Sequence, residues 1–298
     1  MKSAPIVLLV LYNLLGLCFS FQAPLRTSRP VARLDLQTKI FQHTTLNLFG
    51  DSSSTENGSV DRTDDAEGFT INPTYAAAWA GLVAFAFSSY APGALNSPAD
   101  NELLQAIIAN PVAPDINPLF FFVFNLFGPM PLILANLLLP QQEGKLPAGP
   151  FVIASSAIGY FALGPYMAFR REPTAPLAPS DGWFTRNVAE STLACGLVAV
   201  LCALVYTQLP IALGSDGGTA VQEFIDLLQT SRFCAVATID LFLLYIVTTV
   251  SVAKDVALRN PDSKDQAVPI ALATAVVPYL GAAVYCTLRP KVVNTEEE

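Results

Sequence analysis

Asp240 is the charged residue that lies deepest inside an apolar stretch of this chain, in the run Phe233-Cys-Ala-Val-Ala-Thr-Ile-Asp240-Leu-Phe-Leu-Leu-Tyr245. A carboxylate at the centre of a membrane helix costs about 2.5–3.5 kcal/mol on insertion scales, so it faces the interior of a bundle and finds a partner or a proton there. Two kinds of role fit such a residue. It either relays or binds a proton, a cation or the metal of a pigment, or it makes an interhelical hydrogen bond that fixes packing.

Three further polar residues are candidates for functional positions within the membrane. Asn125 and Asn136 are eleven residues apart, three turns on one helix face, so both can donate into the interior seam that holds Asp240. The alternative for both asparagines is ordinary packing, because polar side chains commonly bond across membrane helices. Arg232 precedes Asp240 by eight residues, two turns along the same helix, which is too far for a contact unless that helix bends.

Catalytic and metal-binding patterns are missing from the sequence. The one histidine is His43, and the cysteines lie in apolar segments without a Cys-x-x-Cys pair. The chain has no Gly-rich phosphate loop, no His-Glu-x-x-His and no Gly-x-Ser-x-Gly. We therefore expect no enzyme, no catalytic residue, no cofactor and no metal site. The net charge of −8, without a basic stripe, also predicts no nucleic-acid partner.

The elements that must position these residues are membrane helices. The 298 residues are 52% hydrophobic and 13% charged, whereas a soluble domain has about 25% charged residues. A bilayer core needs roughly 20 apolar residues in a helix. The sequence predicts an all-α, polytopic helical membrane bundle of about six transmembrane helices, at residues 72–91, 117–139, 149–169, 190–209, 233–252 and 267–288.

Two amphipathic segments lie between the predicted spans, NELLQAIIANP at 101–111 and VQEFIDLLQTSRF at 221–233. Each is expected either to lie along the membrane surface or to pack on the end of the bundle. With six spans, six basic residues fall on one side and five on the other. The loop charges then do not discriminate between the two orientations.

The order of span, amphipathic helix, span and span occurs twice, which indicates an internal repeat. Tyr160, Tyr166 and Arg170 correspond to Tyr279, Tyr285 and Arg289 at a constant offset of 119 residues. Three spans in each unit place two inverted three-helix repeats in opposite orientations, as in many secondary transporters. The alternative is chance, because Tyr and Arg are common at the end of any membrane helix.

The N-terminal region indicates where the protein works. MKSAPIVLLVLYNLLGLCFS has the short basic start and apolar run of a signal peptide, and the Arg-bearing, acid-poor stretch after it has the composition of a transit peptide. We expect a plastid membrane, thylakoid or envelope, with a secretory-pathway membrane as the alternative. The predicted organisation is a signal peptide at 1–20, a transit-peptide-like segment at 21–50, an acidic disordered linker at 51–70, a six-span membrane domain at 71–290 and an acidic tail at 291–298.

Parts of the chain resemble a family of uncharacterised multi-spanning proteins of plant and algal plastids. The leader, joined at Phe21 in CFS-FQAP, resembles the bipartite leader of algae with complex plastids, and residues 220–259 are more weakly similar to a small bacterial membrane family. The resemblance implies a plastid membrane protein and carries over no active-site residue. It is carried by Ser231-Arg232-Phe233 to Ile239-Asp240, by Asp255 and Arg259, by Val277-Pro278-Tyr279-Leu280-Gly281 to Leu288-Arg289-Pro290, and by Asn117-Pro118-Leu119-Phe120 to Asn125-Leu126-Phe127-Gly128.

The sequence therefore favours an integral plastid membrane protein without catalytic chemistry, acting as a structural, assembly or accessory component. Its expected partners are the lipid bilayer and other plastid membrane proteins. The alternative is a small-solute or ion transporter in which Asp240 is the intramembrane coupling group.

Overall fold

The part of the chain that the structure describes is almost entirely helical, which confirms the all-α prediction. The computed structural model describes residues 71–111, 114–143, 146–173, 175–177, 182–214 and 218–292. Within those residues the one β-type pairing is an isolated bridge between Glu143 and Arg171. The predicted signal peptide, the transit-peptide-like segment with His43, the acidic linker and residues 293–298 of the acidic tail lie outside the described residues, so they stay predictions.

Three helical stretches among the described residues are long and apolar enough to cross a membrane. The first joins α5 (Pro118–Asn125) to α6 (Met130–Leu138), and the second joins α9 (Thr192–Tyr206) to α10 (Gln208–Gly214). The third is α12 (Arg232–Arg259), an unbroken helix of 28 residues. A fourth apolar helix, α3 (Pro73–Phe87), is shorter. These helices suggest association with a membrane.

The third predicted span, residues 149–169, folds back on itself. It consists of α7 (Ala148–Ile158) and α8 (Tyr160–Phe169), which pack side by side. Glu143, before α7, pairs with Arg171, after α8, so the two open ends of this hairpin are adjacent. The turn is at Gly159, whose φ of 56° is a conformation that a residue without a Cβ adopts readily. The expectation of one straight helix here is wrong, because the apolar run contains a reversal of direction.

The sixth predicted span, residues 267–288, is a second hairpin. It contains α13 (Ala267–Ala275) and α14 (Leu280–Leu288), and the turn passes through Tyr279 with a φ of 61°. The close return is possible because residue 281 is glycine, since a Cβ there would lie 1.9 Å from the carbonyl oxygen of Thr274. Arg289, just after α14, returns to the end of α12 and binds Asp255. The predicted count of six spans is therefore not confirmed.

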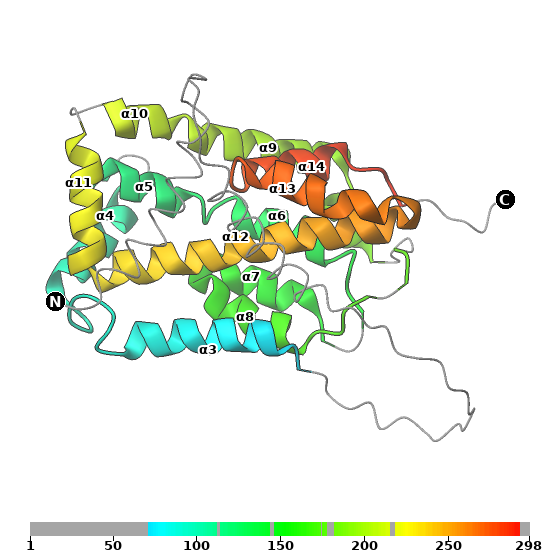
Figure 1. The fold of residues 1–298 in the computed structure, drawn as a ribbon. Helices are drawn as coiled ribbons and strands as arrows, with labels where there is room; N and C mark the ends of the chain where they lie inside the picture. The colour runs from blue at the N-terminus through cyan, green and yellow to red at the C-terminus, as the bar shows by residue number, and fades with distance from the viewer. Residues whose placement is uncertain are drawn as a thin grey trace, which may run out of the picture. The chain divides into compact units, whose positions relative to one another are not determined.

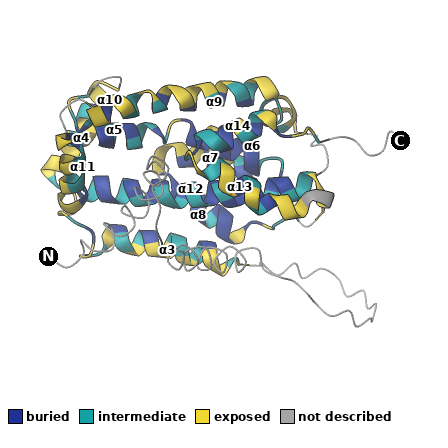
Figure 2. Cartoon of the chain, turned by 45° about the horizontal axis from the view of Figure 1, so that its top comes forward, coloured by how far each residue is buried: buried dark blue, intermediate teal, exposed yellow. Residues whose placement is uncertain are grey.

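Helix α12 occupies the centre of the bundle, with the hairpins and the other long helices around it (Figure 1). Much of α12 is buried, whereas α9 and α10 expose a large part of their surface (Figure 2). The two amphipathic segments form α4 (Pro98–Ala109) and α11 (Thr219–Thr230), which pack at the end where α12 begins. This agrees with the alternative of helices packed on the end of the bundle. Two short irregular helices, η1 (Thr185–Ala189) and η2 (Pro261–Gln266), lie in loops at the opposite end.

The two halves of the chain run in the same direction (Figure 1). Asn72, the N-cap of α3, donates its backbone N–H to Ala168 near the end of α8, and Glu172 just beyond α8 pairs with Lys254 near the end of α12. Glu190, just before α9, binds Arg259 at the same end of α12. Helices α3 and α9 thus start at the same end of the bundle. The predicted opposite orientation of the two repeats is therefore not confirmed, since the third and sixth predicted spans are hairpins.

Candidate functional site

Asp240 lies near the middle of α12 and is bound to the tip of the first hairpin. Its Oδ1 accepts a hydrogen bond of 2.6 Å from the backbone N–H of Tyr160, the first residue of α8. The first N–H groups of a helix have no partner within the helix, and the helix dipole favours a negative charge beside them. Asp240 therefore caps α8 from a neighbouring helix, and the buried carboxylate has a partner.

Gly159 brings the backbone of the hairpin tip directly against this carboxylate. A Cβ at position 159 would lie 1.7 Å from Oδ2 of Asp240 and 2.8 Å from Oδ1. Only a glycine permits that approach, and the positive φ at the same residue makes the requirement twofold. Gly159 and the Asp240 carboxylate are therefore in direct packing contact.

The tip of the second hairpin meets α12 at the next residue. The hydroxyl of Tyr279 donates a hydrogen bond of 2.6 Å to the carbonyl oxygen of Leu241. Nearby, Tyr245 of α12 donates to the carbonyl oxygen of Ala275 at 2.7 Å, which ties α13 to the same helix. Both hairpin tips therefore meet the centre of α12, at Asp240 and Leu241. The sequence carried a signal for this arrangement, because Gly159-Tyr160 and Pro278-Tyr279 occupy equivalent positions in the predicted repeat.

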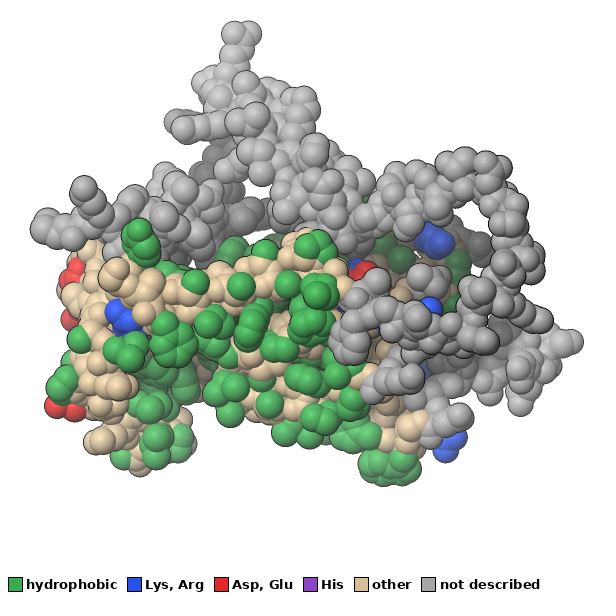
Figure 3. All heavy atoms as spheres, turned by 90° about the horizontal axis from the view of Figure 1, so that it is seen from below, with side chains coloured by type: hydrophobic (Ala, Val, Ile, Leu, Met, Phe, Trp, Pro, Cys, Tyr) green, Lys and Arg blue, Asp and Glu red, His purple; other side chains and the backbone are tan. Residues whose placement is uncertain are grey.

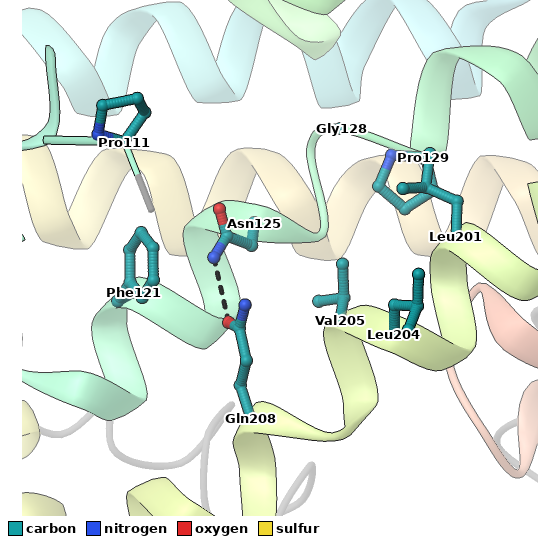
Figure 4. Close-up of a pocket in the computed structure, with 9 residues that line it drawn as sticks. All are labelled: Pro111, Phe121, Asn125, Gly128, Pro129, Leu201, Leu204, Val205 and Gln208. Carbon is teal, nitrogen blue, oxygen red and sulfur yellow. Dashed lines mark hydrogen bonds between the residues drawn. The ribbon is translucent and has the colours of Figure 1, made fainter. Parts of the chain in front are cut away.

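Asn125 is not part of the Asp240 site. Its Nδ2 donates to Oε1 of Gln208 at 2.9 Å, linking α5 to the start of α10 (Figure 4). The bonded amides lie beside a cavity of about 330 Å³. The other lining residues are mostly apolar: Pro111, Phe121, Gly128, Pro129, Leu201, Leu204 and Val205. Asp240 does not line this cavity.

Asn136 and Arg232 also lie apart from Asp240. The carbonyl oxygen of Asn136 accepts a hydrogen bond from Arg289 at 2.8 Å, whereas its side-chain nitrogen is buried without a hydrogen-bond partner. Arg232 donates to the carbonyl oxygens of Ala86, Ala91 and Gly93 at 2.9–3.2 Å, which ties the segment after α3 to the start of α12. The shared seam expected for Asn125, Asn136 and Asp240 is therefore wrong, because the hairpin tips fill the space beside Asp240.

Glu190, Asp255, Arg259 and Arg289 form a charge cluster at the C-terminal end of α12. Asp255 Oδ2 lies 2.7 Å from Nε of Arg259 and 3.1 Å from Nη1 of Arg289, and Glu190 binds both arginines. The hydroxyl of Tyr285 donates to the same Asp255 oxygen at 2.8 Å. Two acids and two arginines balance in charge, which lets them share a buried position. Sequence reasoning missed this cluster, although Asp255 and Arg259 stand at the i, i+4 spacing of a helical ion pair.

Arg170 is buried without such neutralisation. None of its three guanidinium nitrogens has a hydrogen-bond partner among the described residues, and its guanidinium carbon lies 5.9 Å from the centre of the Tyr166 ring. Lys254, on α12, pairs with Glu172 just beyond Arg170. This second group of charges lies, like the charge cluster, at the C-terminal end of α12.

Within the described residues, no three His, Cys, Asp or Glu side chains are grouped as metal ligands, and Cys195, Cys202, Cys234 and Cys286 are free and buried. Comparisons with protein-family models, with curated proteins and with solved structures found no match. Function is therefore argued from the geometry of this chain.

Proposed function

We propose that this protein is an integral plastid membrane protein without catalytic chemistry, acting as a structural, assembly or accessory component. The observation that carries the proposal is the use of Asp240. Its carboxylate caps α8 through Tyr160 and is pressed against Gly159, so the one acid in the middle of α12 serves helix packing. The plastid location rests on the leader in the sequence.

The proposed membrane architecture has four crossing helices and two re-entrant hairpins. Helices α3, α5–α6, α9 and α12 cross, and the α7–α8 and α13–α14 hairpins enter from the side on which α12 ends. Non-helical backbone at membrane depth requires protein around it, and the contacts of Tyr160 and Tyr279 with α12 supply that cover. Hydrophobic side chains cover the middle of one face of the bundle, and charged side chains lie toward its ends (Figure 3).

Helix boundaries support a tandem repeat with an offset of 119 residues. Helices α3 (Pro73–Phe87) and α9 (Thr192–Tyr206) begin and end at that offset. Asn72 and Ser191, also 119 apart, are the N-caps of these helices, and each accepts a backbone N–H with its side chain. Helices α7 and α13 begin at residues 148 and 267, again at that offset. The repeat is parallel, with both halves in one orientation.

This architecture also gives the basic residues a clear asymmetry. Of the nine lysines and arginines in the described part of the chain, all but Arg232 lie at the C-terminal end of α12. The opposite end carries Asp100, Glu102, Asp115, Glu223 and Asp226. The positive-inside rule then favours an orientation in which this basic end faces the stroma. Both hairpins enter the membrane from that end. The numbers of basic residues on the two sides of the membrane were nearly equal only under the assumption of six spans.

A small-solute or ion transporter is the second candidate, with Asp240 as its coupling group. One observation favours it: the tips of two re-entrant hairpins meet α12 at adjacent residues near its middle, and repeats with discontinuous helices are typical of secondary transporters. In that case the tips must separate from Asp240 during a transport cycle.

The variant Asp240→Asn distinguishes the two candidates. Asparagine keeps an oxygen that accepts the Tyr160 N–H but cannot carry a coupled charge. A packing protein then accumulates in plastid membranes at the normal level, and its tagged mature form co-purifies the same membrane partners. A proton-coupled transporter accumulates equally but loses solute uptake. Normal growth and uptake in this variant remove the transporter, whereas lost uptake at normal abundance removes the packing role.

A further inference from the structure

Arg170 is a buried cation whose hydrogen-bonding groups are unused. The residue is 3% exposed, and its Nε, Nη1 and Nη2 have no hydrogen-bond partner in the described part of the chain. An unpaired charge held away from water costs several kcal/mol, which is why buried arginines are normally paired. The neighbouring Tyr166 is neutral, so it supplies a cation–π contact but no balancing charge. Among the described residues the nearby acid, Glu172, is paired with Lys254, so no carboxylate is left to balance this guanidinium.

The proposed repeat offers a comparison for Arg170, because the equivalent arginine in the second half has balancing acids. Arg289, the equivalent of Arg170, is neutralised by Asp255 and Glu190. Subtracting 119 from the numbers of those two acids leads to Asn136 and Ile71, neither of which carries a charge. This step rests on the proposed repeat. The first half of the chain thus keeps the arginine but has neither of the acids that balance it in the second half.

The neighbours of Arg170 are suited to an oxyanion. The hydroxyl of Tyr75 is also buried without a hydrogen-bond partner and lies within electrostatic reach of Arg170. The Lys254 ammonium lies 5.7 Å from the centre of the Tyr75 ring and is paired with Glu172. The group of Arg170, Lys254 and Glu172 therefore contains two cations and one acid. Its net charge is +1, whereas the charge cluster that contains Arg289 is neutral.

We propose that Arg170 binds a phosphate group, with the Tyr75 hydroxyl as a second donor. Guanidinium groups bind phosphate through paired hydrogen bonds, and a buried site strengthens them. The neighbours of Arg170 in the chain, Phe169 and Arg171, are both exposed, so the site lies next to the molecular surface at the basic end of the bundle. The phosphate belongs either to the headgroup of an anionic lipid or to a free anion.

Thermal unfolding of the purified full-length mature protein in detergent tests this site. One arm adds inorganic phosphate against sodium chloride of equal ionic strength. The other adds phosphatidylglycerol against an uncharged galactolipid. At a free ligand concentration of about one hundred times the Kd, binding raises the Tm by about 5 °C or more. A rise in the lipid arm alone identifies the headgroup, and a rise with inorganic phosphate identifies the free anion.

Three variants separate the site from its neighbours. Arg170→Gln should abolish the rise, and Arg171→Gln, which removes an adjacent exposed charge, should keep it. Tyr75→Phe removes the hydroxyl of the second donor without changing the ring, so it should weaken the apparent affinity at least tenfold. The proposal is overturned if neither arm raises the Tm, or if Arg170→Gln responds like the unchanged protein. If Arg170→Gln fails to fold, Tyr75→Phe decides, and an undiminished rise in that variant overturns the proposal.

Discussion

The backbone N–H of Tyr160 lies 2.6 Å from the carboxylate of Asp240, and this bond joins the tip of one hairpin to the centre of α12. The residues are 80 apart in the chain. Because Tyr160 begins α8, its N–H would otherwise be an unpaired donor in an apolar interior. The bond therefore satisfies a donor and an acceptor that each need a partner at this depth.

Replacing Asp240 by leucine should destabilise the fold much more than replacing it by asparagine. Leucine removes the acceptor and leaves the buried N–H of Tyr160 unpaired, at a cost of about 1–3 kcal/mol. Asparagine keeps an acceptor of nearly the same shape. Chemical unfolding in detergent micelles measures both variants. Equal loss of stability in the two would mean that the hydrogen bond to Tyr160 does not hold the tip.

Gly159→Ala should be among the most damaging small substitutions in the protein. The added Cβ would lie 1.7 Å from Oδ2 of Asp240, at a residue with positive φ, so both packing and backbone resist it. We expect a loss of at least about 2 kcal/mol. Gly149→Ala in α7 is the matched control, because nothing lies within 4 Å of a Cβ there. An unchanged free energy of unfolding for Gly159→Ala in the same assay would contradict the close contact between Gly159 and Asp240.

The second hairpin tip gives a milder prediction. Tyr279→Phe removes the hydroxyl that donates to the Leu241 carbonyl oxygen at 2.6 Å, without changing the ring. The net loss should be about 0.5–1.5 kcal/mol. Tyr90→Phe serves as the control, because Tyr90 is largely exposed. The midpoint of unfolding should therefore fall for Tyr279→Phe and stay the same for Tyr90→Phe; a pair of identical midpoints would argue against the contact.

Breaking the charge cluster should cost more than removing a surface charge. Arg289→Gln leaves the buried Asp255 with Arg259 as its remaining basic partner and unbalances the cluster, at about 3–5 kcal/mol. Arg186→Gln removes an exposed arginine from the same end of the bundle and should change stability by less than about 0.5 kcal/mol. The amount of folded protein recovered after expression and its Tm measure the difference. Similar values for both variants would show that the cluster contributes little.

Sequence reasoning predicted the helical class and the apolar segments, because composition and periodicity are local properties. It missed the reversals at Gly159 and Tyr279, since hydropathy records how apolar a segment is and not its direction. Two apolar helices of about ten residues on either side of a tight turn have the same hydropathy as one span. The partners of Asp240 and Asp255 were missed for a related reason: Tyr160 reaches Asp240, and Arg289 reaches Asp255, only after the chain has folded back.

We propose that each half of the chain has two crossing helices and one re-entrant hairpin, and labelling of single introduced cysteines tests this architecture most directly. The native Cys195, Cys202, Cys234 and Cys286 are buried. A membrane-impermeant maleimide should therefore react with an introduced, exposed cysteine in preference to these four. The variants are Glu102→Cys, Arg186→Cys, Asp226→Cys, Lys264→Cys and Lys291→Cys, all at exposed residues. In sealed membranes, positions 186, 264 and 291 should react from one side, and positions 102 and 226 from the other. Six full spans would instead group 102 with 186 and 264, and 226 with 291, and that result would contradict the account.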